Sequence, residues 1–213
     1  MISLPRLDRT IFVWINTGWS NSVFDVIMPW ISRLADAATI WLWIVFICLL
    51  MGWQITHLAK AGQGRGHHRA TMRAIGLFCL YMVLIYGVNA GVFNGLKHLF
   101  HRSRPFLQQT VILRVSTTTA SSLGNDSSFP SGHAGNAFMV VALLAERLRR
   151  KRYIFYGLAA LVALSRIYLG VHYASDVIVG ACLGLAITWF MLFFPPLRSR
   201  MMGEDLLLYQ TDV

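Results

Sequence analysis

The sequence predicts an all-α membrane protein, a polytopic bundle of transmembrane helices with five clear spans. The first observation is composition: the chain of 213 residues is 56% hydrophobic and 13% charged, with a mean hydropathy of +0.55. An ordinary soluble domain is roughly a quarter charged, so this chain could not cover a water-facing surface. The second observation is that most of the 19 Lys and Arg residues lie between long apolar runs. That pattern is typical of basic loops between spans and does not indicate a nucleic-acid-binding protein.

Each predicted span is an apolar run that approaches the roughly 20 helical residues needed to cross a bilayer. Three runs contain no charged residue: Ala37–Thr56, Ala74–Leu96 and Val177–Leu197. Ala134–Ala145 becomes a full span if its helix starts near Pro130, and Tyr153–Val171 is long enough but carries Arg166. No linker or repeat divides the chain, so we expect residues 1–213 to form a single domain.

The N-terminal segment, residues 1–36, has a different pattern. Its apolar stretch Thr10–Ser32 is interrupted by Asn16-Thr17-Gly18, by Asp25 and by Pro29. Its three Trp residues favour the membrane–water interface. We therefore predict interfacial or half-inserted helices in this segment, with a sixth span as the alternative.

Lys and Arg residues indicate the orientation, because basic loops stay in the cytoplasm. They gather in three places: 60–73, 147–152 and the tail 198–213. We therefore predict that this tail is cytoplasmic, and that the long segment Lys97–Phe129 and the turn Val171–Ser175 lie on the outer face. Within the long segment, the Ser- and Thr-rich stretch Ser116–Ser128 is either a simple loop or part of a rim over a site.

Polar residues that are unusual in membrane helices converge on the predicted outer face. Lys97 ends the second span there, and Pro130-Ser131-Gly132-His133 opens the third. Arg166 and His172 lie near the outer end of the fourth span, and Asp176 starts the fifth. An Arg within a span costs about 2.5–3.5 kcal/mol on insertion scales and is functional by default, with snorkelling to the interface as the alternative.

Two cations, Lys97 and Arg104, are seven residues apart and share a face if the helix continues beyond the span. Pro105 would then end that helix. A pair of cations on one face suits an oxyanion, although snorkelling interfacial cations are the alternative for this pair taken alone. We interpret the nearby Arg102 and its neighbouring His residues, His98 and His101, as headgroup or substrate-rim contacts rather than catalysts.

Two further fragments suit phosphate chemistry. At the predicted helix start, Ser131 can cap, Gly132 permits close backbone approach, and free N–H groups attract a phosphate; a plain cap with a surface His133 is the alternative. His172 and Asp176 are spaced i,i+4, so their side chains can meet if helix continues through the turn. The carboxylate would then orient the imidazole and stabilise its charged form. Asp176 could equally cap the last span, and both roles are compatible.

The cations at this face would repel a metal ion, so we predict no metal. A cationic pocket with two histidines and one carboxylate fits phosphoryl transfer instead. The cations bind the phosphate, one His attacks it, and the other His protonates the leaving oxygen.

Taken together, these residues resemble the type 2 phosphatidic acid phosphatase (PAP2) superfamily of membrane lipid phosphatases. Its three motifs are matched in order: Lys97, six residues and Arg104-Pro105; Pro130-Ser131-Gly132-His133; and Ser165-Arg166, five residues, His172, three residues and Asp176. The matched motifs cover a bit over a third of the chain, and the pattern of spans extends the resemblance to most of the rest.

The resemblance implies a role for each matched residue. His172 would be the nucleophile that forms a phosphohistidine, Asp176 would orient it, and His133 would be the general acid. The phosphate would be held by five residues: Lys97, Arg104, Ser131, Gly132 and Arg166. The reaction would need no metal and no cofactor.

The resemblance also implies a hydrolase of a lipid phosphate or pyrophosphate, at the periplasmic face of a bacterial inner membrane. Small stand-alone bacterial members often act on undecaprenyl pyrophosphate, so this lipid is the expected substrate. Phosphatidylglycerophosphate, phosphatidic acid and lipid A are the alternative substrates, and transfer of the phosphate to another lipid is the alternative reaction. A lipid-phosphate transporter or flippase is the alternative from another class, because it would bind the same headgroups without chemistry. Apart from lipids we expect no obligate partner.

Overall fold

The computed structural model describes residues 4–59 and 65–193, and all regular secondary structure in this part of the chain is helical. The predicted cytoplasmic tail, 198–213, lies outside the described residues. The helices are α1 (Leu4–Asn16), α2 (Ser22–Arg33), α3 (Ala37–Ala59), α4 (Arg65–Phe100), α5 (Pro105–Gln108), α6 (Thr117–Gly124), α7 (Gly132–Arg147), η1 (Arg149–Lys151), α8 (Arg152–Tyr168) and α9 (Ala174–Leu192).

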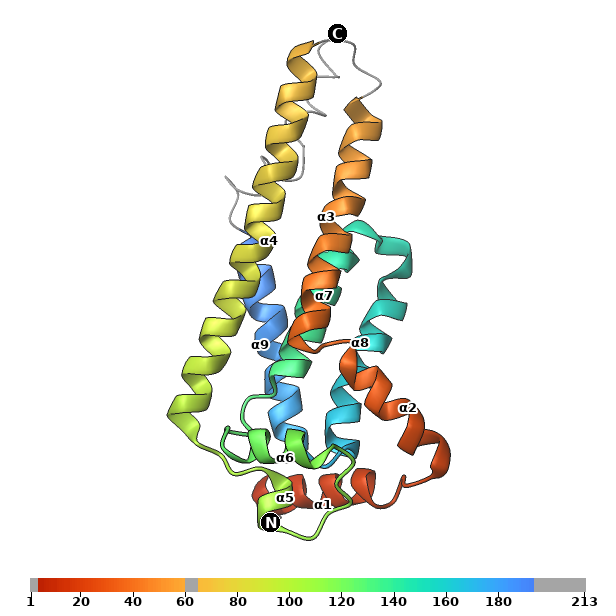
Figure 1. The fold of residues 1–213 in the computed structure, drawn as a ribbon, viewed down its shortest axis with the longest axis vertical. Helices are drawn as coiled ribbons and strands as arrows, with labels where there is room; N and C mark the ends of the chain where they lie inside the picture. Colours follow the sequence, from red (N-terminus) through yellow and green to blue (C-terminus); the bar gives the residue numbers. More distant parts are fainter. Residues whose placement is uncertain (1–3, 60–64, 194–213) are drawn as a thin grey trace.

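The longer helices form an elongated bundle that is closed at one end by short helices. Figure 1 shows α3 and α4 side by side and α7, α8 and α9 gathered beside them, with α1, α5 and α6 grouped at one end. The segment between α4 and α7 and the turn between α8 and α9 both lie at this end. It is the end at which the polar motifs meet.

Close packing of α7 against α9 depends on glycine. A Cβ atom at Gly180 would collide with the backbone carbonyl of Ser131, and one at Gly184 would collide with the carbonyl of Gly135. Small residues let two helix backbones approach closely, as is common between membrane helices. This contact brings the start of α7 against the start of α9, where Ser131 N–H donates to the Asp176 carbonyl at 3.0 Å.

Apolar side chains cover both the inside and the outside of the bundle. On α3, Ile40, Ile44 and Ile47 are buried in a core shared with α4 and α7, whereas Leu42 and Leu49 are exposed. A helix that is apolar on all sides is suited to a lipid environment. The exposed apolar residues therefore support the predicted membrane location.

The predicted number of spans is not confirmed. Among the described residues, two stretches are long and apolar enough to cross a membrane alone, Ile75–Gln108 and Ala174–Leu192. A third is obtained if α2 and the first part of α3, which meet at an angle of 60°, are counted as one bent span. Because α7 and α8 have only 16 and 17 residues, five spans remain a prediction.

The N-terminal segment forms two separate helices rather than one continuous span. Asn21 caps α2 by accepting a hydrogen bond from the Phe24 N–H at 2.9 Å, which separates α2 from α1. In Figure 1, α1 lies across the end of the bundle. On α1, Phe12 and Ile15 are buried and Trp14 is exposed, as expected of an amphipathic helix that covers the end of the bundle.

The boundaries of α4 differ from the prediction at both ends. The helix begins at Arg65 rather than Ala74, so part of the basic stretch that we predicted as a loop is helical. It ends at Phe100, before Pro105, and His101 has a positive φ of 45°. Arg104 therefore lies in extended backbone ahead of α5, and the expectation that Lys97 and Arg104 share one helical face is wrong.

Candidate active site

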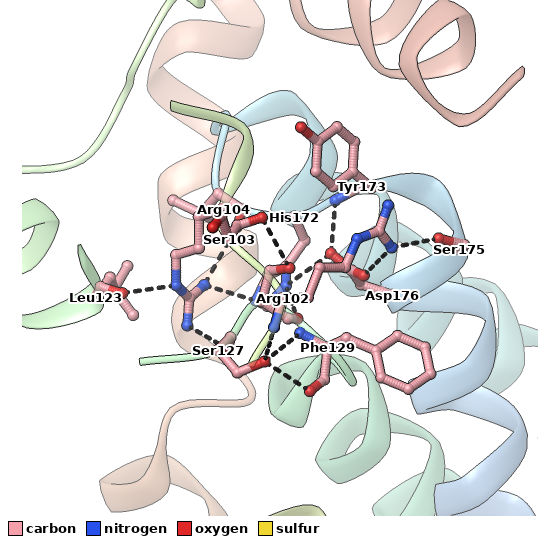
Figure 2. A network of polar contacts seen from close by, with 12 residues as sticks. Arg102, Ser103, Arg104, Leu123, Ser127, Phe129, His172, Tyr173, Ser175 and Asp176 are labelled. Atoms are coloured by element: carbon pink, nitrogen blue, oxygen red, sulfur yellow. Dashed lines mark hydrogen bonds and ion pairs between the residues drawn. The ribbon is translucent and has the colours of Figure 1, made fainter. Parts of the chain in front are cut away.

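Arg104 is a buried cation whose donors are all directed at protein groups. Its hydrogen bonds, between 2.8 and 3.2 Å, go to the carbonyls of Leu123, Asp126, Ser127 and Val171, to the Asp126 carboxylate and to His172 Nε2. Figure 2 shows the guanidinium between the segment around Ser127 and His172. Ser116–Ser128 is thus not a simple loop: it contains α6, and its backbone carbonyls hold a cation of the site.

His172 has a defined tautomer because of the groups around it. Its Nδ1 lies 2.7 Å from the Ser128 carbonyl, which can only accept, so Nδ1 carries the proton. Nε2 is then unprotonated and accepts from Arg104 Nη1 at 3.2 Å. Burial lowers the pKa of His172 well below its usual value, and the charges of Arg104 and Arg166 lower it further. The imidazole is therefore neutral, with its lone pair on Nε2.

Asp176 adjoins His172 but is not its nearest acceptor. Its Oδ2 lies 3.6 Å from His172 Nδ1 and accepts from the Tyr173 N–H at 2.9 Å, while its Oδ1 binds Arg102 at 2.5 Å. We expected Asp176 to orient the imidazole, yet the closer acceptor is the Ser128 carbonyl. The expected capping of α9 by this carboxylate is confirmed, because the Tyr173 N–H is its partner.

Lys97 and Arg104 come together through a third residue. The carboxylate of Asp126 pairs with Lys97 and, at 3.2 Å, with Arg104 Nη2. Burial raises the pKa of Asp126, but the hydrogen bond and charge of Lys97, together with the charge of Arg104, outweigh this and lower it overall. An ionised carboxylate therefore pairs with both cations, as a phosphate oxygen would.

His133 lies in more open surroundings than His172. Its Nε2 is 2.7 Å from Asp36 Oδ1, in the turn between α2 and α3, and the side chains are 26% and 45% exposed. The hydrogen bond from His133 lowers the pKa of Asp36. The second histidine is thus paired with an ionised, partly exposed carboxylate.

Two buried polar atoms of the predicted site have no partner within the described residues: Ser131 Oγ and Arg166 Nε. Ser131 is the N-cap of α7, but its hydroxyl makes no capping bond. Arg166 is buried and donates from Nη1 to Ser32 Oγ at 2.5 Å. Unsatisfied buried donors are rare and costly, so a hydroxyl and a guanidinium N–H left in this way point to a missing acceptor.

Sequence reasoning missed or misread four residues of this region. Arg102, which we interpreted as a rim contact, instead binds Asp176 and Asp8. Asp36 directly precedes a predicted span at its outer end, so its position carried a signal that we did not use. Asp126 lies in the Ser- and Thr-rich segment, where no pattern marks it, and nothing in the sequence relates Asp8 to the motifs.

The described residues contain no group of three His, Cys, Asp or Glu side chains placed to hold a metal ion. The predicted absence of a metal nevertheless stays a prediction. What the geometry does provide is a set of cations around one neutral, fixed imidazole.

The proteins similar to this chain include three curated bacterial phosphatases. Phosphatidylglycerophosphatase B of Bacillus subtilis is 36% identical over 126 residues, 54% of each chain. Lipid A 4'-phosphatase of Porphyromonas gingivalis is 34% identical over 113 residues, 51% of this chain and 47% of the relative. Lipid A 1-phosphatase of Rhizobium etli is 31% identical over 164 residues, which are 74% of this chain and 66% of the relative. The chain thus spans about half to two thirds of these relatives.

The crystal structure of Aquifex aeolicus LpxE has a similar fold, with a TM-score of 0.57 and 23% sequence identity, over 88% of this chain and 96% of that one. A family model described as the PAP2 superfamily matches residues 74–200, which include all three motifs and most of the bundle. Together with the motif residues gathered at one end of the bundle, this match shows that the chain belongs to the PAP2 superfamily.

Proposed function

We propose that this chain is a metal-independent lipid phosphatase that works through a phosphohistidine at His172. The observation that carries the proposal is the pair of buried, unpartnered donors, Ser131 Oγ and Arg166 Nε, within a site whose histidine has its lone pair on Nε2, where it accepts a hydrogen bond from Arg104. An anion would satisfy both donors. A phosphoryl group bound there would also meet a nucleophile.

The first step forms the phosphoenzyme. The hydrogen bond from Arg104 Nη1 to His172 Nε2 is replaced by one from Arg104 to the bound phosphate. The Nε2 lone pair then attacks the phosphorus atom, the bond from phosphorus to the lipid oxygen breaks, and that oxygen takes the electron pair. His133 donates a proton to the leaving oxygen. The Ser128 carbonyl accepts from Nδ1–H throughout and, with Asp176 nearby, stabilises the positive charge on the ring.

The second step releases phosphate. His133, now unprotonated, takes a proton from water as the water oxygen attacks phosphorus, and the bond from phosphorus to Nε2 breaks. Lys97, Arg104, Arg166, Ser131 and the Gly132 N–H hold the phosphate oxygens in both steps. The phosphate would displace the Asp126 carboxylate from Lys97 and Arg104, since one anion replaces another on the same donors.

The relatives support a lipid monoester phosphate as the substrate. They are named for phosphatidylglycerophosphate and for the phosphates of lipid A. We therefore propose a monoester of this kind, with undecaprenyl pyrophosphate as the pyrophosphate to be compared with it. The site would face the periplasm of a bacterial inner membrane, because the basic residues of η1 lie away from the end that carries the motifs.

Release of inorganic phosphate by the purified full chain tests the activity. The panel is phosphatidylglycerophosphate, phosphatidic acid, lipid A and undecaprenyl pyrophosphate, each with EDTA. ³²P-labelled substrate should give an acid-labile phosphoenzyme with the wild type and none with His172→Gln. If the wild type moves labelled lipid across vesicles without releasing phosphate, and His172→Gln does so equally, the chain is a transporter and not a phosphatase.

Labelling of single cysteines tests the sidedness. In a background with all native cysteines replaced, Ser121→Cys, at the site end, should react with an impermeant thiol reagent added outside the cell. Arg150→Cys, in η1, should react only after the membrane is opened. Both positions are exposed, so access depends on the side of the membrane. The reverse pattern would place the site in the cytoplasm.

A further inference from the structure

Asp8 on α1 is a buried carboxylate that the phosphatase mechanism does not use. Its side chain is 5% exposed. It accepts hydrogen bonds from the Ser175 N–H at 2.9 Å, from the Ser175 hydroxyl at 2.5 Å and from Arg102 Nη2 at 2.6 Å. A carboxylate loses hydration when it is buried, so it persists only where charged or polar partners replace water. Asp8 therefore has a specific set of partners at the start of α9.

Arg102 joins Asp8 to Asp176. While its Nη2 binds Asp8, its Nη1 binds Asp176 Oδ1 at 2.5 Å and Ser175 Oγ at 2.7 Å. The guanidinium also lies over the Tyr173 ring, 4.4 Å from its centroid. Figure 2 shows Arg102 directed at Asp176 and Ser175, whereas Arg104 is directed at the other side of His172. The planar fork of Arg allows one cation to fix two carboxylates at once.

The bond to Arg102 determines how Asp176 faces His172. With Oδ1 held by the guanidinium and Oδ2 by the Tyr173 N–H, the carboxylate plane is fixed at both oxygens. Oδ2 then lies 3.6 Å from His172 Nδ1. The positive charge of Arg102 favours an ionised Asp176 carboxylate on the Nδ1 side of the ring, opposite the attacking Nε2. The negative charge of this carboxylate favours the cationic ring formed during phosphoryl transfer.

We propose that Arg102 is a positioning residue for the reaction, that it acts through Asp176 on His172, and that Asp8 completes the arrangement from α1. The proposal rests on the proposed phosphatase function. It assigns to the N-terminal helix a part in setting the geometry of the nucleophile. Neither Asp8 nor Arg102 is among the residues proposed to hold the phosphate.

Arg114 offers a matched control. It too lies over a tyrosine ring, 4.1 Å from the centroid of Tyr168, and it too pairs with a carboxylate of an N-terminal helix, Asp25, at 2.5 Å. Its contacts tie α2 and the end of α1 to the rest of the bundle, but they include neither Asp176 nor His172. If Arg102 mattered only through packing of the N-terminal helices, substitutions at Arg102 and at Arg114 should therefore lower activity to a similar extent.

Arg102→Lys keeps the charge but removes the fork. We expect kcat to fall about 10- to 100-fold, because small misplacements of reacting groups have effects of this size, while KM changes less than about twofold. Asp8→Asn keeps the acceptor oxygen for the Ser175 N–H and should give a smaller loss in kcat. Arg114→Lys should leave kcat within about twofold of the wild type, since small effects are expected away from the reacting groups.

The decisive measurement is a double-mutant cycle. In an Asp176→Asn background Arg102→Lys should change kcat less than twofold, because the group through which it acts has already lost its charge. If the effects of the two changes multiply instead, Arg102 does not act through Asp176 and the proposal is overturned. Should Arg102→Lys fail to fold, Asp8→Asn takes its place in the cycle.

A second readout separates this proposal from the phosphatase function. Histidine ¹H–¹⁵N spectra of the full chain in detergent report the His172 ring directly. Arg102→Lys should shift its nitrogen signals, and Arg114→Lys should not. If the wild type releases no phosphate from any lipid but these shifts are seen, the phosphatase function fails and the positioning contact stands. If the signals are unchanged in Arg102→Lys, the positioning proposal fails even when the enzyme is active.

Discussion

The two histidines of the site are the same side chain in two different surroundings. His172 is 2% exposed, is held by a backbone carbonyl at one nitrogen and by Arg104 at the other, and lies in a turn between two helices. His133 is partly exposed in the first turn of α7 and pairs with a carboxylate that also faces solvent. Burial with fixed partners suits a neutral nucleophile. At His133, burial and the charge of Arg166 lower the pKa to about 4, while the hydrogen bond and charge of Asp36 act in the opposite direction and favour the protonated ring that an acid needs.

The largest effect expected from this comparison is the loss of the nucleophile. His172→Gln should lower phosphate release by more than about 10⁴-fold on every substrate, because removal of a nucleophile abolishes the covalent route. His133→Gln should retain measurable phosphoenzyme formation with p-nitrophenyl phosphate. Equal residual rates for the two variants with this substrate would show that the histidines do not divide the work as proposed.

The second effect depends on the leaving group. His133→Ala should slow a lipid monoester by about 10²–10⁴-fold, because acid catalysis contributes this much when the leaving oxygen needs a proton. p-Nitrophenyl phosphate, whose leaving group is already stable as an anion, should be slowed far less. Rates are to be compared under conditions in which chemistry limits both substrates. A uniform slowing would make His133 a phosphate ligand rather than the acid.

A third and smaller effect concerns the Asp126 carboxylate, which pairs with the cations next to His172. Asp126→Asn should tighten inhibition by inorganic phosphate or vanadate by about three- to tenfold, because partly exposed ion pairs contribute modestly. The variant removes the negative charge that occupies Lys97 and Arg104. Asp36→Asn, on the His133 side, is the matched control and should leave inhibitor affinity within about twofold, because Asp36 contacts neither cation. Weaker inhibition of Asp126→Asn would mean that this carboxylate helps to build the phosphate site.

The smallest effect is on stability. Burial, followed by the charges of Arg104 and Arg166, holds the pKa of His172 below the 6.5 of a free imidazole. Below pH 6.5 the unfolded chain therefore binds a proton that the folded chain does not, and stability falls as the pH falls. At one pH unit below 6.5, the pKa of the unfolded chain's imidazole, the free energy of unfolding is lower by about 1.4 kcal/mol.

This loss can be measured from unfolding between pH 7.5 and 5.5 in detergent. The dependence on pH should be weaker in His172→Gln than in the wild type, while replacement of the exposed His98 by Gln is the control. An identical slope for wild type and His172→Gln would show that His172 is not held neutral in the folded protein.

The sequence by itself determined the helical membrane class and the residues that meet at one end of the bundle. An Arg in an apolar run and a His and Asp four residues apart can be read from the chain. Because successive spans alternate in direction, residues at alternate span ends share a face. The helix starts near Ala37, Pro130 and Asp176 followed in the same way from local capping and apolar runs.

Only the tertiary structure decided how these residues are paired. Asp8 reaches Ser175 across 167 positions of sequence, and Arg114 reaches Asp25 across 89. The acceptor that fixes the His172 tautomer is a backbone carbonyl, which every residue has and no sequence pattern distinguishes. Because α4 ends at Phe100, Arg104 lies outside the helix and contacts Asp126 and His172. Residue types determine what chemistry is available, but partners across the bundle depend on how the helices pack, and packing is not local in sequence.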